Sequence, residues 1–195
     1  MKYVGLGIAV VIVGYLSVYT YLRHVDNKGQ EAYNLAYDML SRSENPAETA
    51  ENAEKPAALF QKVIDEYGVS EAARLALPQV AHILFVEGNY EEAIAHYRRF
   101  GKEMSGAVAY EGLNSLALAD CYEAQGDYQK AVDVLTPVVD AKDNPFRESA
   151  MLSLERVLRL DGQDQKAETL LKEFVKTYPN SPFSPMVKAR LRKAT

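Results

Sequence analysis

The sequence predicts an all-α protein, with an apolar helix at the N-terminus and a solenoid of stacked helical hairpins after it. The solenoid is predicted by three segments that repeat one pattern: GNYEEAIAHY from Gly88, GDYQKAVDVL from Gly126 and GQDQKAETLL from Gly162. Their glycines are 38 and 36 residues apart, a period typical of helix pairs that stack on one another. The apolar helix is predicted by an uncharged run of 20 residues, Tyr3–Leu22.

Each hairpin is expected to turn at its glycine, because a residue without a Cβ readily takes the left-handed conformation that ends a helix. Before each turn, apolar residues recur every three or four positions, as on one face of a helix. An alanine follows each glycine by five residues, and we expect it where the two helices touch. The expected hairpins span about 71–104, 107–140 and 145–178, and Asn144 and Pro145 are expected to start the third.

Two further elements complete the expected solenoid. FQKVIDEYGVS from Phe60 parallels LKEFVKTYPNS from Leu171, which indicates a degenerate unit over about 30–67. Ser184 and Pro185 can begin a final helix, about 184–194, that caps the open end of the solenoid. The acidic segment 43–55 is expected to be a solvated linker, and an acidic docking arm is the alternative.

The repeated positions resemble tetratricopeptide repeats, which carry a small residue in the first helix, a glycine before the turn, an alanine in the second helix and a closing proline. The matching sets are Ala81, Gly88, Ala93 and Tyr97; Ala119, Gly126, Ala131 and Leu135; and Gly162, Ala167, Leu171 and Pro179. The third copy departs from this pattern, since Glu155 stands where the small residue belongs. The resemblance implies a scaffold that binds proteins and is not an enzyme.

The run Tyr3–Leu22 is expected to span a membrane, because twenty helical residues cover about 30 Å, the thickness of a bilayer core. A cleavable signal peptide is the alternative, but the residues after the run lack the small pair that cleavage needs. We therefore expect an uncleaved anchor within residues 1–28 and the solenoid over 29–195. Gly5 and Ala9 are spaced for close contact between membrane helices, which leaves a homo-oligomer open.

The charge balance limits the partners. The chain carries a net charge of −5, and residues 29–195 alone carry −7, which argues against a nucleic-acid partner. Lys2 and Arg23 flank the apolar run on opposite sides, so the positive-inside rule barely discriminates between orientations. Many signal anchors with a short N-terminal tail export the rest of the chain, and we expect the solenoid outside the cytoplasm.

No catalytic motif, phosphate-binding glycine loop or metal-ligand spacing is present in the sequence, so no catalytic residue, metal or cofactor is expected. His82 and His96 lie at similar distances from the Gly88 turn, but they lack further ligands and are expected to be ordinary core or surface residues. Cys121 is expected to be a small buried apolar residue.

The first helices of tetratricopeptide hairpins line a concave groove, and this resemblance implies a partner-binding surface here. The candidate residues on that surface are Leu75, His82, Phe85, Leu116, Asp120, Glu123, Leu152, Arg156 and Arg159. They combine apolar, acidic and basic side chains, and the alternative is that several of them simply pack within the solenoid.

One span followed by a degenerate repeat domain resembles the YfgM-like ancillary subunits of the bacterial SecYEG translocon. This resemblance implies a single-pass inner-membrane protein with a periplasmic solenoid, which binds translocon subunits, exported or unfolded chains and chaperones. The alternative is a scaffold for envelope assembly or cell division, as in the related cell-division coordinator CpoB. An enzyme or metal-binding protein is a remote alternative.

Overall fold

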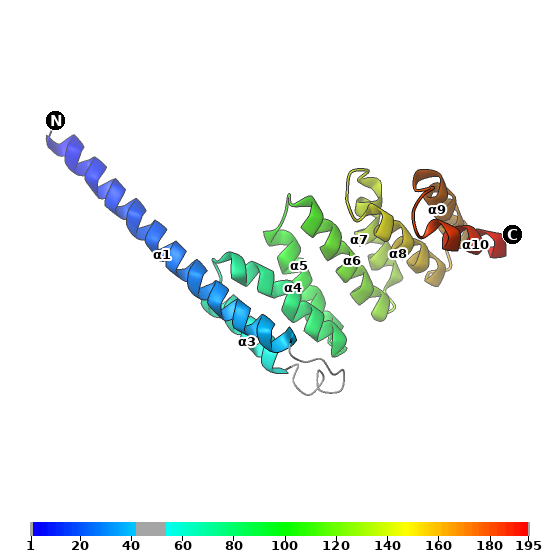
Figure 1. Ribbon diagram of the computed structural model, residues 1–195, viewed down its shortest axis with the longest axis horizontal. Helices are drawn as coiled ribbons and strands as arrows, with labels where there is room; N and C mark the ends of the chain where they lie inside the picture. Colours follow the sequence, from blue (N-terminus) through cyan, green and yellow to red (C-terminus); the bar gives the residue numbers. More distant parts are fainter. Residues whose placement is uncertain (1, 42–53, 195) are drawn as a thin grey trace. The chain divides into compact units, whose positions relative to one another are not determined.

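The computed structural model describes the backbone of residues 2–41 and 54–194, together with their side chains except those of residues 2–7, 9, 10, 54, 55, 193 and 194. The described residues form helices and no strand (Figure 1), so the all-α prediction is confirmed. The helices are α1 (Lys2–Ser41), α3 (Glu54–Glu66), α4 (Glu71–Val86), α5 (Tyr90–Glu103), α6 (Val108–Ala124), α7 (Tyr128–Asp140), α8 (Arg147–Leu160), α9 (Asp164–Thr177) and α10 (Ser184–Ala194).

The chain divides into two compact units, residues 1–87 and 88–195. The first unit contains α1, α3 and α4, and the second contains α5 to α10. The division falls inside the hairpin expected at 71–104, so its two helices belong to different units. The boundary expected at residue 28 falls inside α1, and the acidic segment 43–55 lies outside the residues with described side chains.

In the first unit, the C-terminal half of α1 packs against both α3 and α4. Gly29 and Ala36 are its buried residues. Gly29 allows a close approach, because a Cβ at this position would lie 2.7 Å from the Ser70 hydroxyl oxygen. One turn earlier, Asp26 Oδ1 accepts a hydrogen bond of 2.9 Å from the backbone N–H of Glu71, at the start of α4. Two contacts therefore fix α1 to the N-terminus of α4.

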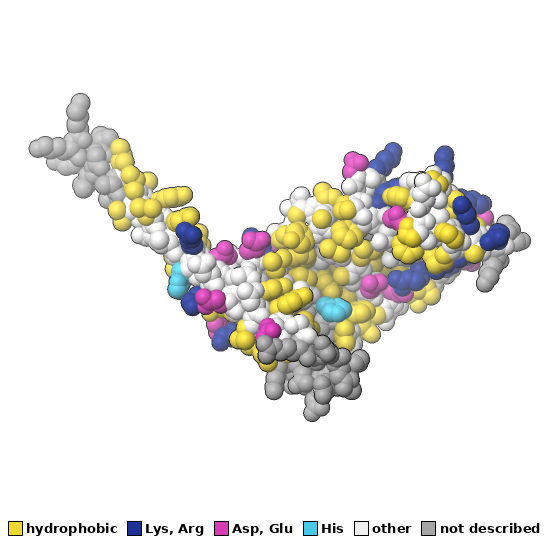
Figure 2. All heavy atoms as spheres, viewed as in Figure 1, with side chains coloured by type: hydrophobic (Ala, Val, Ile, Leu, Met, Phe, Trp, Pro, Cys, Tyr) yellow, Lys and Arg dark blue, Asp and Glu magenta, His cyan; other side chains and the backbone are white. Residues whose placement is uncertain are grey.

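The N-terminal half of α1 has a different environment. Residues 8 and 11–24 are all exposed, and most of them are apolar, as the yellow side chains beside the grey end of the chain show in Figure 2. Among the residues that the structure describes, no helix is both long enough and apolar enough to cross a membrane. The surroundings of Gly5 and Ala9, expected to pack in the membrane, lie outside what the structure describes.

In the second unit, each helix from α5 to α10 packs against the next one along the chain, and α6 also contacts α8. Contact between α6 and α8, the first helices of successive hairpins, is what a solenoid requires. The three alanines expected between helices, Ala93, Ala131 and Ala167, are completely buried. The core positions predicted from the repeat are therefore confirmed.

The predicted turn glycines Gly88, Gly126 and Gly162 all adopt positive φ, between +74° and +84°. At Gly126 the N–H donates to Glu123 O, at 2.9 Å, and the N–H of Asp127 donates to Tyr122 O, at 2.8 Å. This pair of bonds is a Schellman motif, which satisfies the last carbonyls of α6. A side chain at this φ would be strained, so glycine is required for the turn.

The start of α8 differs from the prediction. The helix begins at Arg147 and not at Pro145, because the Asn144 side chain stabilises a turn that precedes the helix. Asn144 Oδ1 accepts a 2.9 Å hydrogen bond from the backbone N–H of Phe146, as in an Asx turn. Gly112 of α6 makes room for Asn144, since a Cβ there would lie 2.8 Å from Asn144 Oδ1.

Candidate interaction face

The nine residues predicted to bind a partner lie on three helices, and none belongs to the fully buried core. Leu75 and Phe85 of α4 are half-buried and His82 of α4 is exposed, all in the first unit. The other six lie in the second unit: Leu116, Asp120 and Glu123 on α6, and Leu152, Arg156 and Arg159 on α8. Within the second unit, side chains of the α6 and α8 residues contact one another.

The charged residues of α6 and α8 pair with each other across the helix contact. Arg156 donates to Asp120 Oδ1 at 3.2 Å and also to Glu123. The side chains of Arg156 and Asp120 are 45% and 50% exposed, so water and salt screen much of this attraction. An exposed pair such as Arg156–Asp120 contributes about 0–1 kcal/mol to stability. Glu123 is only 20% exposed, so its pair with Arg156 is less screened. Their clearer effect is to set how α6 and α8 align.

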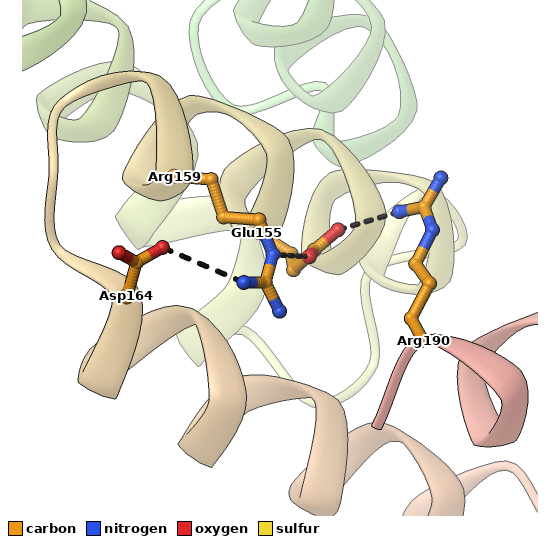
Figure 3. Close-up of polar contacts among 4 residues, drawn as sticks. All are labelled: Glu155, Arg159, Asp164 and Arg190. Carbon is orange, nitrogen blue, oxygen red and sulfur yellow. Dashed lines mark hydrogen bonds and ion pairs between the residues drawn. The ribbon is translucent and has the colours of Figure 1, made fainter. Parts of the chain in front are cut away.

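Glu155 is the centre of a second group of charges (Figure 3). Its side chain is only 1% exposed, although its position in the repeat normally holds a small residue. Arg159 Nε donates to one carboxylate oxygen at 2.5 Å, and an Arg190 guanidinium N–H donates to the other at 2.6 Å. Arg159 also lies 3.5 Å from Asp164, and the hydrogen bond that it donates to Glu155 raises the Arg159 pKa above its ordinary value. The buried carboxylate thus has a partner for each oxygen and joins α8 to α10.

These ion pairs give the register of three helices. α6 and α8 run in the same direction, because one helix, α7, returns between them. Since Arg156 lies opposite Asp120, Leu152 lies opposite Leu116, each one turn earlier in its helix. The Arg190–Glu155 pair brings α10 to the same side of α8, with Met186 about one turn before Arg190 and Leu152 about one turn before Glu155.

The second unit therefore presents one face with two rows, which we call the α6–α8–α10 face. Its apolar row consists of Leu113, Leu116, Leu152, Phe183 and Met186. Its charged row consists of Asp120, Glu123, Arg156, Arg159 and Arg190, together with the buried Glu155 with which Arg159 and Arg190 pair. The three acids and three bases balance, so this row has no net charge.

The apolar row is more exposed than the sequence alone indicated. Leu113 is 47% exposed, Phe183 43% and Met186 39%, and none of the three is among the residues predicted from the repeat. Extending the helical spacing one turn back from Leu116 would have found Leu113. The other two precede Arg190, whose place beside Glu155 is a tertiary contact and not a sequence pattern.

The two histidines and the cysteine considered in the sequence do not form a metal-binding or catalytic group among the described residues. In the part of the chain that the structure describes, no group of His, Cys, Asp and Glu side chains could hold a metal ion. His82 is exposed on α4 and His96 is half-buried on α5, in different units. Cys121 is fully buried, as expected, and burial together with nearby Asp120 raises its pKa to about 11. A thiol with so high a pKa is a poor nucleophile.

Comparisons with known proteins agree with this architecture. A family model described as a tetratricopeptide repeat-like domain matches residues 1–142, and a tetratricopeptide repeat model matches residues 149–181. Two solved structures of nearly identical TPR-like repeats, from a Podosopora anserina protein described as a kinesin light chain, are similar to the chain. Each is 20% identical to it and covers 83% of this chain and 93% of its own, with TM-scores of 0.55 and 0.54. At this identity the likeness shows the fold alone.

No curated protein matches the chain. The family model nevertheless covers most of its length, so the chain belongs to the tetratricopeptide repeat-like family. Folds of this class typically serve as non-enzymatic scaffolds for protein–protein interaction.

Proposed function

We propose that this chain is a membrane-anchored, non-enzymatic scaffold that binds proteins, with its helical repeats outside the cytoplasm of a bacterial cell. The observation that carries the proposal is the division of α1 into two halves. Its C-terminal half packs in the first unit, whereas residues 8 and 11–24 have exposed side chains, most of them apolar. Apolar surface of this extent is costly in water, and a bilayer around the run Tyr3–Leu22 would remove that cost.

The α6–α8–α10 face supports a protein partner. Its charges are already paired with one another, so a charged partner would have to displace existing ion pairs. Its exposed apolar row can instead accept apolar side chains of an unfolded or extended segment. We propose that the partners are exported chains, translocon subunits and chaperones at the protein translocon. This narrower assignment is supported by the resemblance to ancillary translocon subunits seen in the sequence.

The orientation is tested by thiol labelling. In a Cys121→Ala background, a cysteine placed at Ala194 should react with a membrane-impermeant thiol reagent in intact spheroplasts. A cysteine placed at Lys2 is the matched control and should react only after lysis. Labelling of the Ala194 site only after lysis would contradict an extracytoplasmic solenoid.

The partner class is tested by capture from native membranes. Recovery of translocon subunits and chaperones supports the proposal, whereas recovery of wall-synthesis or division proteins would move the chain to envelope assembly. Phe85→Ala should weaken capture by about 2 kcal/mol if this aromatic side chain is a binding hot spot. Circular dichroism of the variant must match that of the wild type, so that loss of capture is not loss of fold.

A further inference from the structure

One end of the first unit is attached directly to the apolar half of α1. We call it the anchor-proximal edge and define it as residues 23–28 of α1 together with the turn between α3 and α4, residues 67–70. The edge is held by the hydrogen bond between Asp26 Oδ1 and the N–H of Glu71, at 2.9 Å. Gly29 packs just beyond it, where a Cβ would lie 3.2 Å from the Cβ of Tyr67.

The connection between the apolar run and this edge has no hinge. Residues 23–28, RHVDNK, contain neither proline nor glycine, and α1 is helical through all of them. With a helical rise of about 1.5 Å per residue, Asp26 lies about 6 Å along the axis from Leu22, and Gly29 about 10 Å. The headgroup layer on each side of a bilayer core is about 5–8 Å thick. A bilayer whose core ends near Leu22 would therefore bring its headgroups to the level of the edge.

We propose that the anchor-proximal edge rests on the headgroup layer of the bilayer, with the turn between α3 and α4 in contact with it. This inference rests on the proposed membrane anchor and adds a second lipid contact to it. Val69, at the tip of the turn, has a side chain that is 68% exposed and faces no core. Val69 would therefore face the lipid headgroups.

The charges of the edge select the kind of lipid surface. Asp65 and Glu66 end α3 beside the turn, and Glu71 begins α4, all with exposed side chains. Arg23 and Lys28 are the cations of the α1 segment, and Lys28 is paired with Glu31 at 2.7 Å. The edge as defined has one acid, Asp26, against these two cations, and only the flanking acids, of which Glu66 is paired with Lys62, bring the region to a small acidic excess. Such a region has little attraction for anionic lipid. Zwitterionic headgroups fit it better, and the continuous helix, not charge, holds the edge in place.

The test uses the full chain in nanodiscs of phosphatidylcholine, in a Cys121→Ala background, with a bimane fluorophore on a single cysteine. Val18→Cys reports the anchor, Val69→Cys reports the edge, and Val86→Cys is the matched control. Val86 is also a valine of the first unit, 66% exposed, but it lies at the other end of α4, about 22 Å along that helix from Glu71. The quenchers are phosphatidylcholines with a spin label on the headgroup or on the acyl chain.

We expect the acyl-chain label to quench bimane at Val18, and the headgroup label to quench it at Val69 and not at Val86. If Val18 is not quenched by the acyl-chain label, the anchor itself is wrong, and the proposed function fails with it. If Val18 is quenched but Val69 is quenched no more than Val86, the anchor stands and the edge contact is overturned.

A second variant tests whether the helix holds the edge. His24→Pro breaks the hydrogen-bond ladder of α1 between the anchor and the first unit. We expect loss of headgroup quenching at Val69, with acyl-chain quenching at Val18 retained. Retained quenching at Val69 would show that the edge is bound by its own attraction for lipid, and would overturn the role given to the helix.

Discussion

Breaking the charge group around Glu155 should destabilise the second unit far more than breaking the exposed pair beside it. The perturbation is the double substitution Arg159→Met and Arg190→Met, which removes the hydrogen-bond donors from both oxygens of a carboxylate that is 1% exposed. Methionine keeps much of the apolar stem of each arginine, so the change is mainly in charge. Glu155 is then left buried without a cation.

The size of the effect follows from burial. An uncompensated buried charge left by removal of its partner costs about 3–5 kcal/mol. Because Arg159 and Arg190 are 33% and 43% exposed, water can reach the vacated places, and we expect the lower limit, about 3 kcal/mol. In a protein of this size, about 2–4 °C is lost per kcal/mol, so the thermal midpoint should fall by about 6–12 °C.

The assay is thermal unfolding of the full chain in detergent, followed by far-ultraviolet circular dichroism. Arg156→Met is the matched control, since it removes an arginine of the same face whose partners Asp120 and Glu123 are 50% and 20% exposed, against 1% for Glu155, and it should cost about 1 kcal/mol. Adding Glu155→Met to the double variant removes the buried charge and should restore most of the lost stability. An unchanged midpoint in the double variant, or no recovery in the triple variant, would refute this reasoning.

Three further predictions concern packing and reactivity. Ala131→Leu should overpack the helix contact and lower the free energy of unfolding by about 1–3 kcal/mol. Ala124→Leu, at an exposed position, should cost little. Equal thermal midpoints for the two variants would contradict the assigned repeat register. Gly29→Ala should loosen α1 from α4, because the new Cβ would meet the Ser70 hydroxyl. The expected result is faster amide hydrogen exchange near Ser70. Unchanged exchange would show that the structure accommodates the extra methyl group without loosening α1. Cys121 should resist alkylation at pH 8 in the folded chain and react promptly in urea. Its raised pKa of about 11 keeps the thiol protonated in the folded chain, and burial shields it. Equal alkylation rates in both conditions would refute its burial.

The elements that the sequence predicts best are those with local causes. The positive φ of Gly126 and Gly162 follows from a turn that only glycine tolerates, and the pattern of three copies shows where each turn lies. The burial of Ala131 and Ala167 follows from the same register. These features need no knowledge of distant contacts, and the structure confirms them.

Features that depend on contacts between distant segments were not predictable in the same way. Glu155 was recognised as a departure from the repeat, but its partner Arg190 lies 35 residues away on the final helix. The start of α8 was placed two residues early, because Asn144 followed by Pro145 is compatible with both a helix start and a turn. The packing of Asn144 against Gly112 decides between them, and that contact involves another helix.

The candidate face shows the same limit. The sequence placed acidic and basic residues on successive helices and predicted that they would meet a partner. The structure pairs Arg156 with Asp120 and Glu123, so these charges are already occupied within the second unit. Partner binding by the nine predicted residues stays a prediction. The apolar row around Leu116 and Leu152 is the part of the face where that prediction is best tested.

The central claim, that the α6–α8–α10 face of an anchored scaffold binds proteins, is tested most directly by site-specific photocrosslinking in intact cells. A photoreactive amino acid is placed in the full chain at Leu116 or Leu152 of the face, and at Gln129 of α7, an exposed position outside it. We predict cross-links to the same partner proteins from Leu116 and Leu152, and none of these from Gln129. Cross-links of equal yield from Gln129, or no protein cross-link from either leucine in folded chains, would contradict the claim.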